Sequence, residues 1–178
     1  FTKGMQQAGV LASAKHFPGH GDTATDSHHT LPVINFDKKR LDTLELYPYK
    51  KMFDAGVASV MTAHLSIPQI VSNPELPSSL SPTIVTDLLK EKMGFLGLII
   101  TDGLNMKGAA NYATSAAIDL AAILAGNDLL LIPQDVPGSV QLIKAALDSG
   151  ALSQERLDFS VRKILSAKYW AGLHAYAP

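Results

Sequence analysis

Titratable side chains crowd into one short segment of the chain, between residues 15 and 29. The cluster comprises Lys15, His16, His20, Asp22, Asp26, His28 and His29. The segment is punctuated by proline and glycine, and it follows an apolar run at residues 9–14. Loops that leave a buried strand commonly carry catalytic groups, because a rigid scaffold positions them. We therefore interpret the cluster as a candidate catalytic loop.

Within this loop, Asp26 and His28 have the spacing of a proton-transfer pair. Side chains at positions i and i+2 of an extended segment lie on the same side, so the Asp26 carboxylate can accept a hydrogen bond from one ring nitrogen of His28. The other nitrogen can then donate and accept a proton near neutral pH. His29 competes as the partner of Asp26, and an exposed polar loop is the alternative interpretation.

Other candidate residues follow apolar runs elsewhere in the chain. Asp102 directly follows the apolar run at residues 96–101, and Gly103 after it lets the chain turn away. A carboxylate there can be a nucleophile or can stabilise a cationic transition state, with a helix N-cap as the alternative. Lys15, His16 and His64 have similar positions and can donate hydrogen bonds to substrate hydroxyls. The alternatives are a core histidine for His16 or His64 and an ion pair for Lys15.

The histidines do not form a recognisable metal signature. No His-x-x-x-His pair with an adjoining glutamate is present, and the chain has no cysteine, so we expect no metal site. Gly19 and Gly21 are not followed by a third glycine that opens a helix, which argues against a dinucleotide fingerprint. We therefore expect no cofactor.

The composition is that of an ordinary globular domain, with 178 residues, 47% of them hydrophobic and 17% charged, and a net charge of −1. Near-neutral charge gives no reason to expect a nucleic-acid partner. No apolar run approaches the roughly 18 residues that would span a bilayer. The absence of cysteine excludes disulfides and thiolate chemistry.

Four short apolar runs predict buried strands, at residues 10–14, 57–62, 96–101 and 128–132. Helical patterns lie before, between and after them, at residues 1–7, 37–55, 82–93, 112–125, 140–147 and from 154 onward. Helix starts are predicted at Ser81 and Ser153, and helix ends at Gly94 and Gly126. Pro48 is expected to divide the 37–55 helix.

These elements define a fold class. Strands that are apolar throughout predict a parallel sheet covered on both faces, and alternating strands and helices are typical of a doubly wound sheet or a (β/α)8 barrel. Lys15-His16, His64 and Asp102 each follow a different predicted strand. Active groups that converge from the ends of several strands are typical of the barrel. A complete barrel takes about 250 residues, whereas this chain has four βα units. The prediction is therefore an α/β fold, the C-terminal half of a TIM-type (β/α)8 barrel with a terminal helix.

Four motifs together resemble glycoside hydrolase family 3, and within it the β-N-acetylhexosaminidases of the NagZ type. They are Lys15-His16-Phe17-Pro18-Gly19-His20-Gly21, Asp26-Ser27-His28, Met61-Thr62-Ala63-His64 and Thr101-Asp102-Gly103-Leu104-Asn105-Met106. The resemblance reaches to about residue 133. It implies a barrel that hydrolyses terminal β-linked N-acetylglucosamine with retention of configuration, on peptidoglycan-derived muropeptides or chitin-type glycans.

The resemblance also implies residue roles. Asp102 would be the nucleophile that forms a glycosyl-enzyme, and His28, with Asp26 as its partner, would be the general acid/base. Lys15 and His16 would bind sugar hydroxyls, and His64 would form part of the wall around the terminal sugar. A histidine departs from the usual pair of carboxylates, but it can serve the same proton transfers at pH 7.

Two departures from the family bear on the extent of the site. Gly103 stands where related sequences often have a second acidic residue. The family takes an aspartate and an arginine that hold the sugar from earlier strands, which these 178 residues do not supply. We therefore expect residues 1–178 to be part of a catalytic domain that needs its N-terminal half-barrel as a partner and is inactive alone.

Three other functions compete with hydrolysis of N-acetylglucosaminides. The first is a phosphorylase, since a neutral histidine repels incoming phosphate less than a glutamate would. The second is another family 3 β-glycosidase, and the third is a non-catalytic half-barrel that binds carbohydrate.

Overall fold

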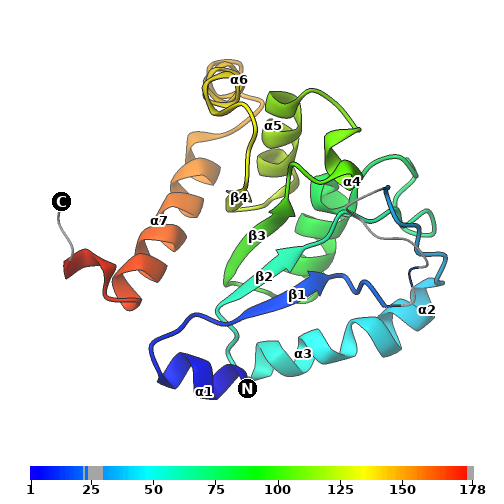
Figure 1. Cartoon of the computed structure of the whole chain (residues 1–178), viewed down its shortest axis with the longest axis vertical. Helices are drawn as coiled ribbons and strands as arrows, with labels where there is room; N and C mark the ends of the chain where they lie inside the picture. The colour runs from blue at the N-terminus through cyan, green and yellow to red at the C-terminus, as the bar shows by residue number, and fades with distance from the viewer. Residues whose placement is uncertain (22, 24–29, 176–178) are drawn as a thin grey trace.

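The computed structural model describes residues 1–21, 23 and 30–175. Its centre is a sheet of four parallel strands that follow one another in chain order (Figure 1). The strands are β1 Ser13–Phe17, β2 Ser59–Thr62, β3 Leu98–Gly103 and β4 Leu129–Leu131. Parallel strands that are neighbours in both sequence and space are the arrangement of a (β/α)8 barrel. The predicted α/β half-barrel is confirmed.

Helices connect the strands and pack around the sheet. The α-helices are α1 Thr2–Gln7, α2 Lys38–Arg40, α3 Tyr47–Asp54, α4 Lys107–Ala110, α5 Ser115–Ala125, α6 Val136–Asp148 and α7 Gln154–Trp170. The π-helical segments are η1 Leu41–Glu45 and η3 Thr83–Lys92, and the 3₁₀ segments are η2 Ser78–Leu80 and η4 Leu173–Ala175. Within the described ranges, no helix is both long enough and apolar enough to cross a membrane.

Most of the predicted helix boundaries are confirmed by local geometry. Gly94 and Gly126 have φ angles of 69° and 119°, in the left-handed region that glycine favours at helix ends. The Ser153 side chain caps α7 by accepting the backbone N–H three residues later at 3.1 Å. At the start of η3 no side-chain cap forms, because Pro82 occupies the N-cap position. Ser81 contributes its backbone carbonyl there instead.

Two strands end further along the chain than the apolar runs that predict them, and both also begin later, β1 at Ser13 and β3 at Leu98. β1 ends at Phe17, three residues beyond the predicted end, so Lys15 and His16 lie inside the strand rather than after it. β3 reaches Gly103 and therefore includes Asp102. The reason is that backbone hydrogen bonds to neighbouring strands set the strand ends, and these bonds continue past the last apolar side chain.

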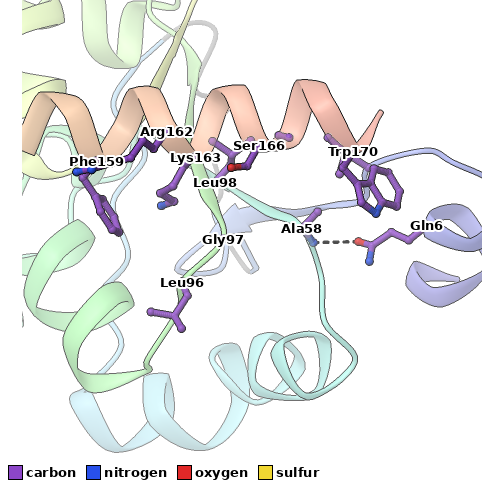
Figure 2. Close-up of a pocket in the computed structure, with 12 residues that line it drawn as sticks. Gln6, Ala58, Leu96, Gly97, Leu98, Phe159, Arg162, Lys163, Ser166 and Trp170 are labelled. Atoms are coloured by element: carbon purple, nitrogen blue, oxygen red, sulfur yellow. Dashed lines mark hydrogen bonds between the residues drawn. The ribbon is translucent and has the colours of Figure 1, made fainter. Parts of the chain in front are cut away.

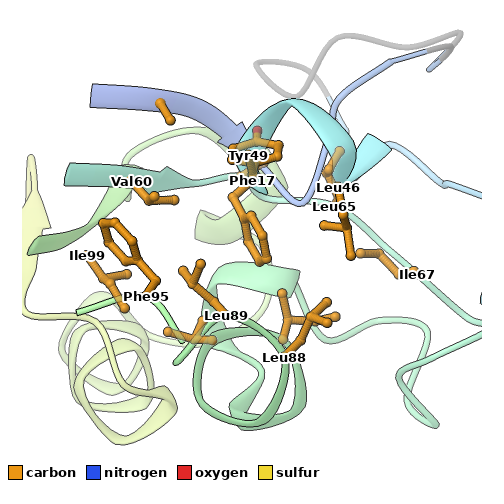
Figure 3. Packing of buried hydrophobic residues seen from close by; sticks show 14 of the residues in the cluster. Phe17, Leu46, Tyr49, Val60, Leu65, Ile67, Leu88, Leu89, Phe95 and Ile99 are labelled. Carbon is orange, nitrogen blue, oxygen red and sulfur yellow. The ribbon is translucent and has the colours of Figure 1, made fainter. Parts of the chain in front are cut away.

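One face of the sheet is covered by helices and forms the main core (Figure 3). Phe17, Val60 and Ile99 from three strands have no exposed surface and belong to the same buried cluster as Leu89 of η3 and Phe95. Burial of this cluster fixes which residues of each strand face the helices, because side chains alternate between the two faces.

The opposite face is only half-buried by the described residues. Met61 and Ile100 pair across β2 and β3 and alternate with buried neighbours, so both point to this side. Asp102, two residues after Ile100, shares the same face. The prediction that both faces are covered is therefore correct for one face only, because the second is the face that turns towards a barrel interior.

A hollow of about 470 Å³ lies between α7 and the amino-terminal ends of the strands (Figure 2). Phe159, Lys163 and Trp170 line it from α7, and Ala58 and Gly97 line it from the entries to β2 and β3. Barrel enzymes carry their active sites at the carboxyl ends of the strands. The hollow is therefore at the opposite end of the sheet from Asp102.

Candidate active site

Two predicted site residues meet at the carboxyl end of the sheet. His16 on β1 approaches Asp102 on β3, with 3.6 Å between His16 Nε2 and Asp102 Oδ2. Their side chains are 31% and 18% exposed, which leaves both within reach of a ligand. Parallel strands end at a common edge of the sheet, and this explains why residues far apart in sequence come together.

The Asp102 carboxylate is anchored through one oxygen. Its Oδ1 accepts the backbone N–H of Gly103 at 2.8 Å. Its Oδ2 faces His16 at a distance beyond a good hydrogen bond. The helix that follows, α4, has Met106 at its N-cap position, so Asp102 has no capping role there. A carboxylate held in this way can attack an electrophilic carbon or stabilise a developing cation.

His16 and Lys15 offer hydrogen-bond donors beside this carboxylate. Burial lowers the pKa of His16, and the opposing effect of Asp102 is smaller. The ring is therefore neutral at pH 7, with one donor and one acceptor nitrogen. Lys15 is exposed and, within residues 1–21, 23 and 30–175, makes no ion pair. Both residues line a hollow of about 470 Å³ that His20 also borders.

His64 lies behind the end of β3 and has no exposed surface. Its Nε2 is 3.0 Å from the Gly103 carbonyl oxygen, and its Nδ1 is 2.7 Å from Ser79 Oγ. Burial lowers the pKa of His64, and the hydrogen bond to the Gly103 carbonyl opposes this effect. These contacts agree with the alternative interpretation of a core histidine. Direct contact of His64 with a sugar stays a prediction.

The histidine-rich loop is described only in part. The His20 Nδ1 atom is 2.6 Å from Thr23 Oγ1, and the His20 ring lies 6.0 Å from that of His16. Four residues of the predicted loop lie outside the described residues: Asp22, Asp26, His28 and His29. The acid/base pair therefore stays a prediction. Among the residues that are described, no three His, Asp or Glu side chains converge as metal ligands would.

Sequence reasoning misses three buried polar residues that lie behind the strand ends, namely Thr62, Ser79 and Asn127. Asn127 Nδ2 donates to the Ser79 carbonyl at 2.8 Å, and its Oδ1 accepts the Thr62 hydroxyl at 2.9 Å. No spacing in the sequence links the three, because tertiary packing of β2, η2 and the entry to β4 brings them together. The only signal available is a polar Asn127 directly before an apolar strand.

Comparison with known sequences places these motifs in one family. A family model described as Glycosyl hydrolase family 3 N terminal domain matches residues 1–167. Beta-hexosaminidase A of Pseudoalteromonas piscicida is 30% identical over 186 residues, which cover 94% of this chain and 31% of that protein. The chain spans about a third of the length of the curated relatives it matches.

Solved structures agree with the sequence comparisons. A glycoside hydrolase family 3 beta-N-acetylglucosaminidase from Paenibacillus sp. str. FPU-7 has a TM-score of 0.92 and 38% identity, over 99% of this chain and 34% of that chain. A beta-glucoside phosphorylase has a TM-score of 0.89 and 27% identity, over 98% of this chain and 33% of that chain.

Proposed function

Because the chain belongs to glycosyl hydrolase family 3, we propose that it carries the nucleophile of a retaining exo-β-N-acetylglucosaminidase. The observation that carries this proposal is the Asp102 carboxylate at the carboxyl end of β3. One of its oxygens is fixed by the Gly103 N–H at 2.8 Å, and the other faces His16. The substrate class is supported by relatives named beta-hexosaminidase and beta-N-acetylglucosaminidase.

The proposed reaction has two displacement steps at one carbon. Asp102 Oδ2 attacks the anomeric carbon of a terminal β-linked N-acetylglucosamine while His28, oriented by Asp26, protonates the departing oxygen. The same imidazole then takes a proton from water as the water oxygen displaces Asp102 and restores the carboxylate. Two inversions leave the β configuration unchanged. Muropeptides derived from peptidoglycan and chitin-type oligosaccharides are the glycans we propose as substrates.

Lys15 and His16 are proposed to hold the hydroxyl groups of the sugar. Because His16 is neutral, it can hydrogen-bond a hydroxyl without neutralising the nearby nucleophile through an ion pair. The exposed Lys15 ammonium adds charged donors on the same strand. Lys15 and His16 on β1 lie at the same edge of the sheet as Asp102 on β3, so a sugar bound by them would lie against the nucleophile.

We further propose that residues 1–178 form part of the catalytic barrel and that an N-terminal half-barrel completes the sugar site. The half-buried face that carries Met61, Ile100 and Asp102 supports this proposal, because barrel interiors are filled by side chains from all strands. The relatives, about three times as long as the matched segment, support it as well.

An Asp102→Asn substitution in the full-length protein that contains this chain tests the proposed function. Hydrolysis of an aryl β-N-acetylglucosaminide should fall by about 10³-fold or more, because the amide is a poor nucleophile of nearly the same shape. Asp87→Asn, on the exposed side of η3, is the matched control and should keep full activity. Unchanged turnover in Asp102→Asn would favour the non-catalytic carbohydrate-binding alternative.

A phosphorylase is the second candidate function, because the structural similarity to a beta-glucoside phosphorylase is also high. In that reaction phosphate, rather than water, would displace Asp102 in the second step. Product analysis with and without phosphate distinguishes the two: free N-acetylglucosamine in both supports hydrolysis, whereas a sugar 1-phosphate would replace that assignment.

A further inference from the structure

A chain of buried hydrogen bonds runs behind the candidate nucleophile, on the helix-covered side of the sheet. His64 is at its centre, between the Gly103 carbonyl and the Ser79 hydroxyl. A carbonyl oxygen can only accept, so His64 Nε2 carries the ring proton. Nδ1 of the neutral ring must then accept, and the Ser79 hydroxyl donates to it at 2.7 Å. The Gly103 carbonyl therefore selects the Nε2–H tautomer of His64, and the Ser79 hydroxyl holds the ring in place by donating to Nδ1.

Ser79 is itself held from two sides. Its backbone N–H donates to the Ala63 carbonyl at 3.1 Å, and its carbonyl accepts Asn127 Nδ2 at 2.8 Å. Asn127 is fixed in turn by the Thr62 hydroxyl at 2.9 Å. Thr62, Ser79 and Asn127 are all fully buried, so the hydroxyl that meets His64 has a defined position.

The residue that receives this support is a glycine. A Cβ atom on Gly103 would lie 2.8 Å from Asn105 Oδ1, so a larger residue at this position would have to displace the Asn105 side chain. Glycine has the widest backbone freedom of any residue. At Gly103, two hydrogen-bond donors to its carbonyl restrict that freedom. The Gly103 carbonyl accepts from His64 Nε2 at 3.0 Å and from the Met106 N–H at 2.9 Å.

Gly103 also holds the nucleophile, since its N–H donates to Asp102 Oδ1 at 2.8 Å. We propose that Ser79 and His64 are positioning residues that fix Gly103 and thereby aim the Asp102 carboxylate at the anomeric carbon. This inference rests on the proposed role of Asp102 as the nucleophile. It gives His64 a role through the backbone of β3 rather than through contact with the sugar.

The test is a Ser79→Ala substitution in the full-length protein, assayed on an aryl β-N-acetylglucosaminide. We expect kcat to fall about 10- to 100-fold, the effect of misplacing a reacting group by a fraction of an ångström to 1 Å. KM should change little, because in this proposal both residues act through the backbone of β3 and not through contact with the sugar. The ¹⁵N resonance of His64 Nδ1 should also shift, because that nitrogen loses its hydrogen-bond donor, while the ring keeps the Nε2–H tautomer.

Ser59→Ala is the matched control. It removes another buried hydroxyl, which donates to the Ala12 carbonyl at 3.1 Å at the opposite end of β2. Its kcat should match that of the unmodified protein even though its Tm falls. Because His64→Leu could prevent folding, His64→Gln is the second variant: its amide retains an N–H donor, and we expect kcat to exceed that of any folded His64→Leu protein.

The outcomes separate this inference from the proposed function. If Asp102→Asn abolishes turnover while Ser79→Ala behaves like Ser59→Ala, Asp102 is the nucleophile and the positioning role is wrong. If Asp102→Asn stays active, the proposed function fails, and the positioning role fails with it. Loss of kcat in Ser79→Ala with an unchanged Nδ1 resonance of His64 would also overturn the inference.

Discussion

His16 and His64, the two described histidines nearest to Asp102, are both kept neutral. Burial is the largest cause of the lowered pKa of each ring. The unfolded chain binds protons at the ordinary histidine value of 6.5, whereas the folded protein binds them only at lower pH. Stability from these two groups is therefore fully present above about pH 6.5 and is lost as the pH falls through the lowered pKa values.

Replacing His64 with Gln should flatten this pH dependence. We expect the free energy of unfolding of the unmodified protein to fall between pH 7 and pH 5, by at most about 1.4 kcal/mol per pH unit for each proton taken up. His64→Gln removes one of the two histidines that take up a proton when the protein unfolds. Urea denaturation from pH 5 to pH 8 measures the slopes, and Ser59→Ala, which removes a buried hydroxyl but no titratable group, should leave the slope unchanged. Equal slopes for His64→Gln and the unmodified protein would contradict the prediction.

How much of the site the sequence predicts depends on the kind of contact. The proximity of His16 and Asp102 is predictable, because the carboxyl ends of parallel strands meet at one edge of the sheet. The contacts of His64 are not, because Ser79 lies on a 3₁₀ turn whose position depends on packing against α5 and η3. An apolar pattern shows which side chains are buried but does not show which buried polar groups pair.

At the scale of secondary-structure elements, a buried ionic cluster attaches α7 to the sheet. Asp128, just before β4, has a fully buried side chain, with Oδ2 2.5 Å from Lys163 Nζ. Oδ2 also accepts the Ile99 N–H at 3.0 Å, and Oδ1 accepts the Ser160 hydroxyl at 2.6 Å. Arg156 lies 3.7 Å from Oδ1. Both oxygens are engaged, which offsets the desolvation of the charge.

Asp128→Ala should lower the free energy of unfolding by about 3–5 kcal/mol, because it leaves Lys163 and Arg156 partly buried without their anion. The control is Asp42→Ala, which breaks an ion pair with Lys92 whose side chains are 34% and 49% exposed. That change should lower it by less than about 1 kcal/mol. Urea denaturation measures both, and similar losses in the two variants would show that the buried cluster does not attach α7.

The sequence predicts which strands and helices form more accurately than it predicts their first and last residues. Each of the four apolar runs overlaps a strand, although only residues 13 and 14 of the run at 10–14 lie in β1. The predicted 112–125 helix begins only at Ser115, after the short α4, and the predicted 140–147 helix begins at Val136, where Asp135 supplies a cap. Hydrophobic periodicity locates the middle of a helix, whereas local capping decides where it begins.

At the scale of the whole molecule, the sheet has two unlike faces. Val60 and Ile99 are fully buried against helices, while Met61 and Ile100 on the other face are half-buried. A contiguous apolar face of this kind is normally covered in a stable protein. The proposed N-terminal half-barrel would cover it and would also close the site around Asp102.

The two adjacent isoleucines of β3 test this directly in the full-length protein. If the barrel is closed, Ile100→Ala should destabilise it by about 2–5 kcal/mol, as a fully buried isoleucine does. Ile99→Ala is the matched reference, since Ile99 is already buried within the described residues. Urea denaturation would then give similar losses for the two variants. A loss below about 1 kcal/mol for Ile100→Ala alone would mean that the face remains open and that the site around Asp102 is completed in another way.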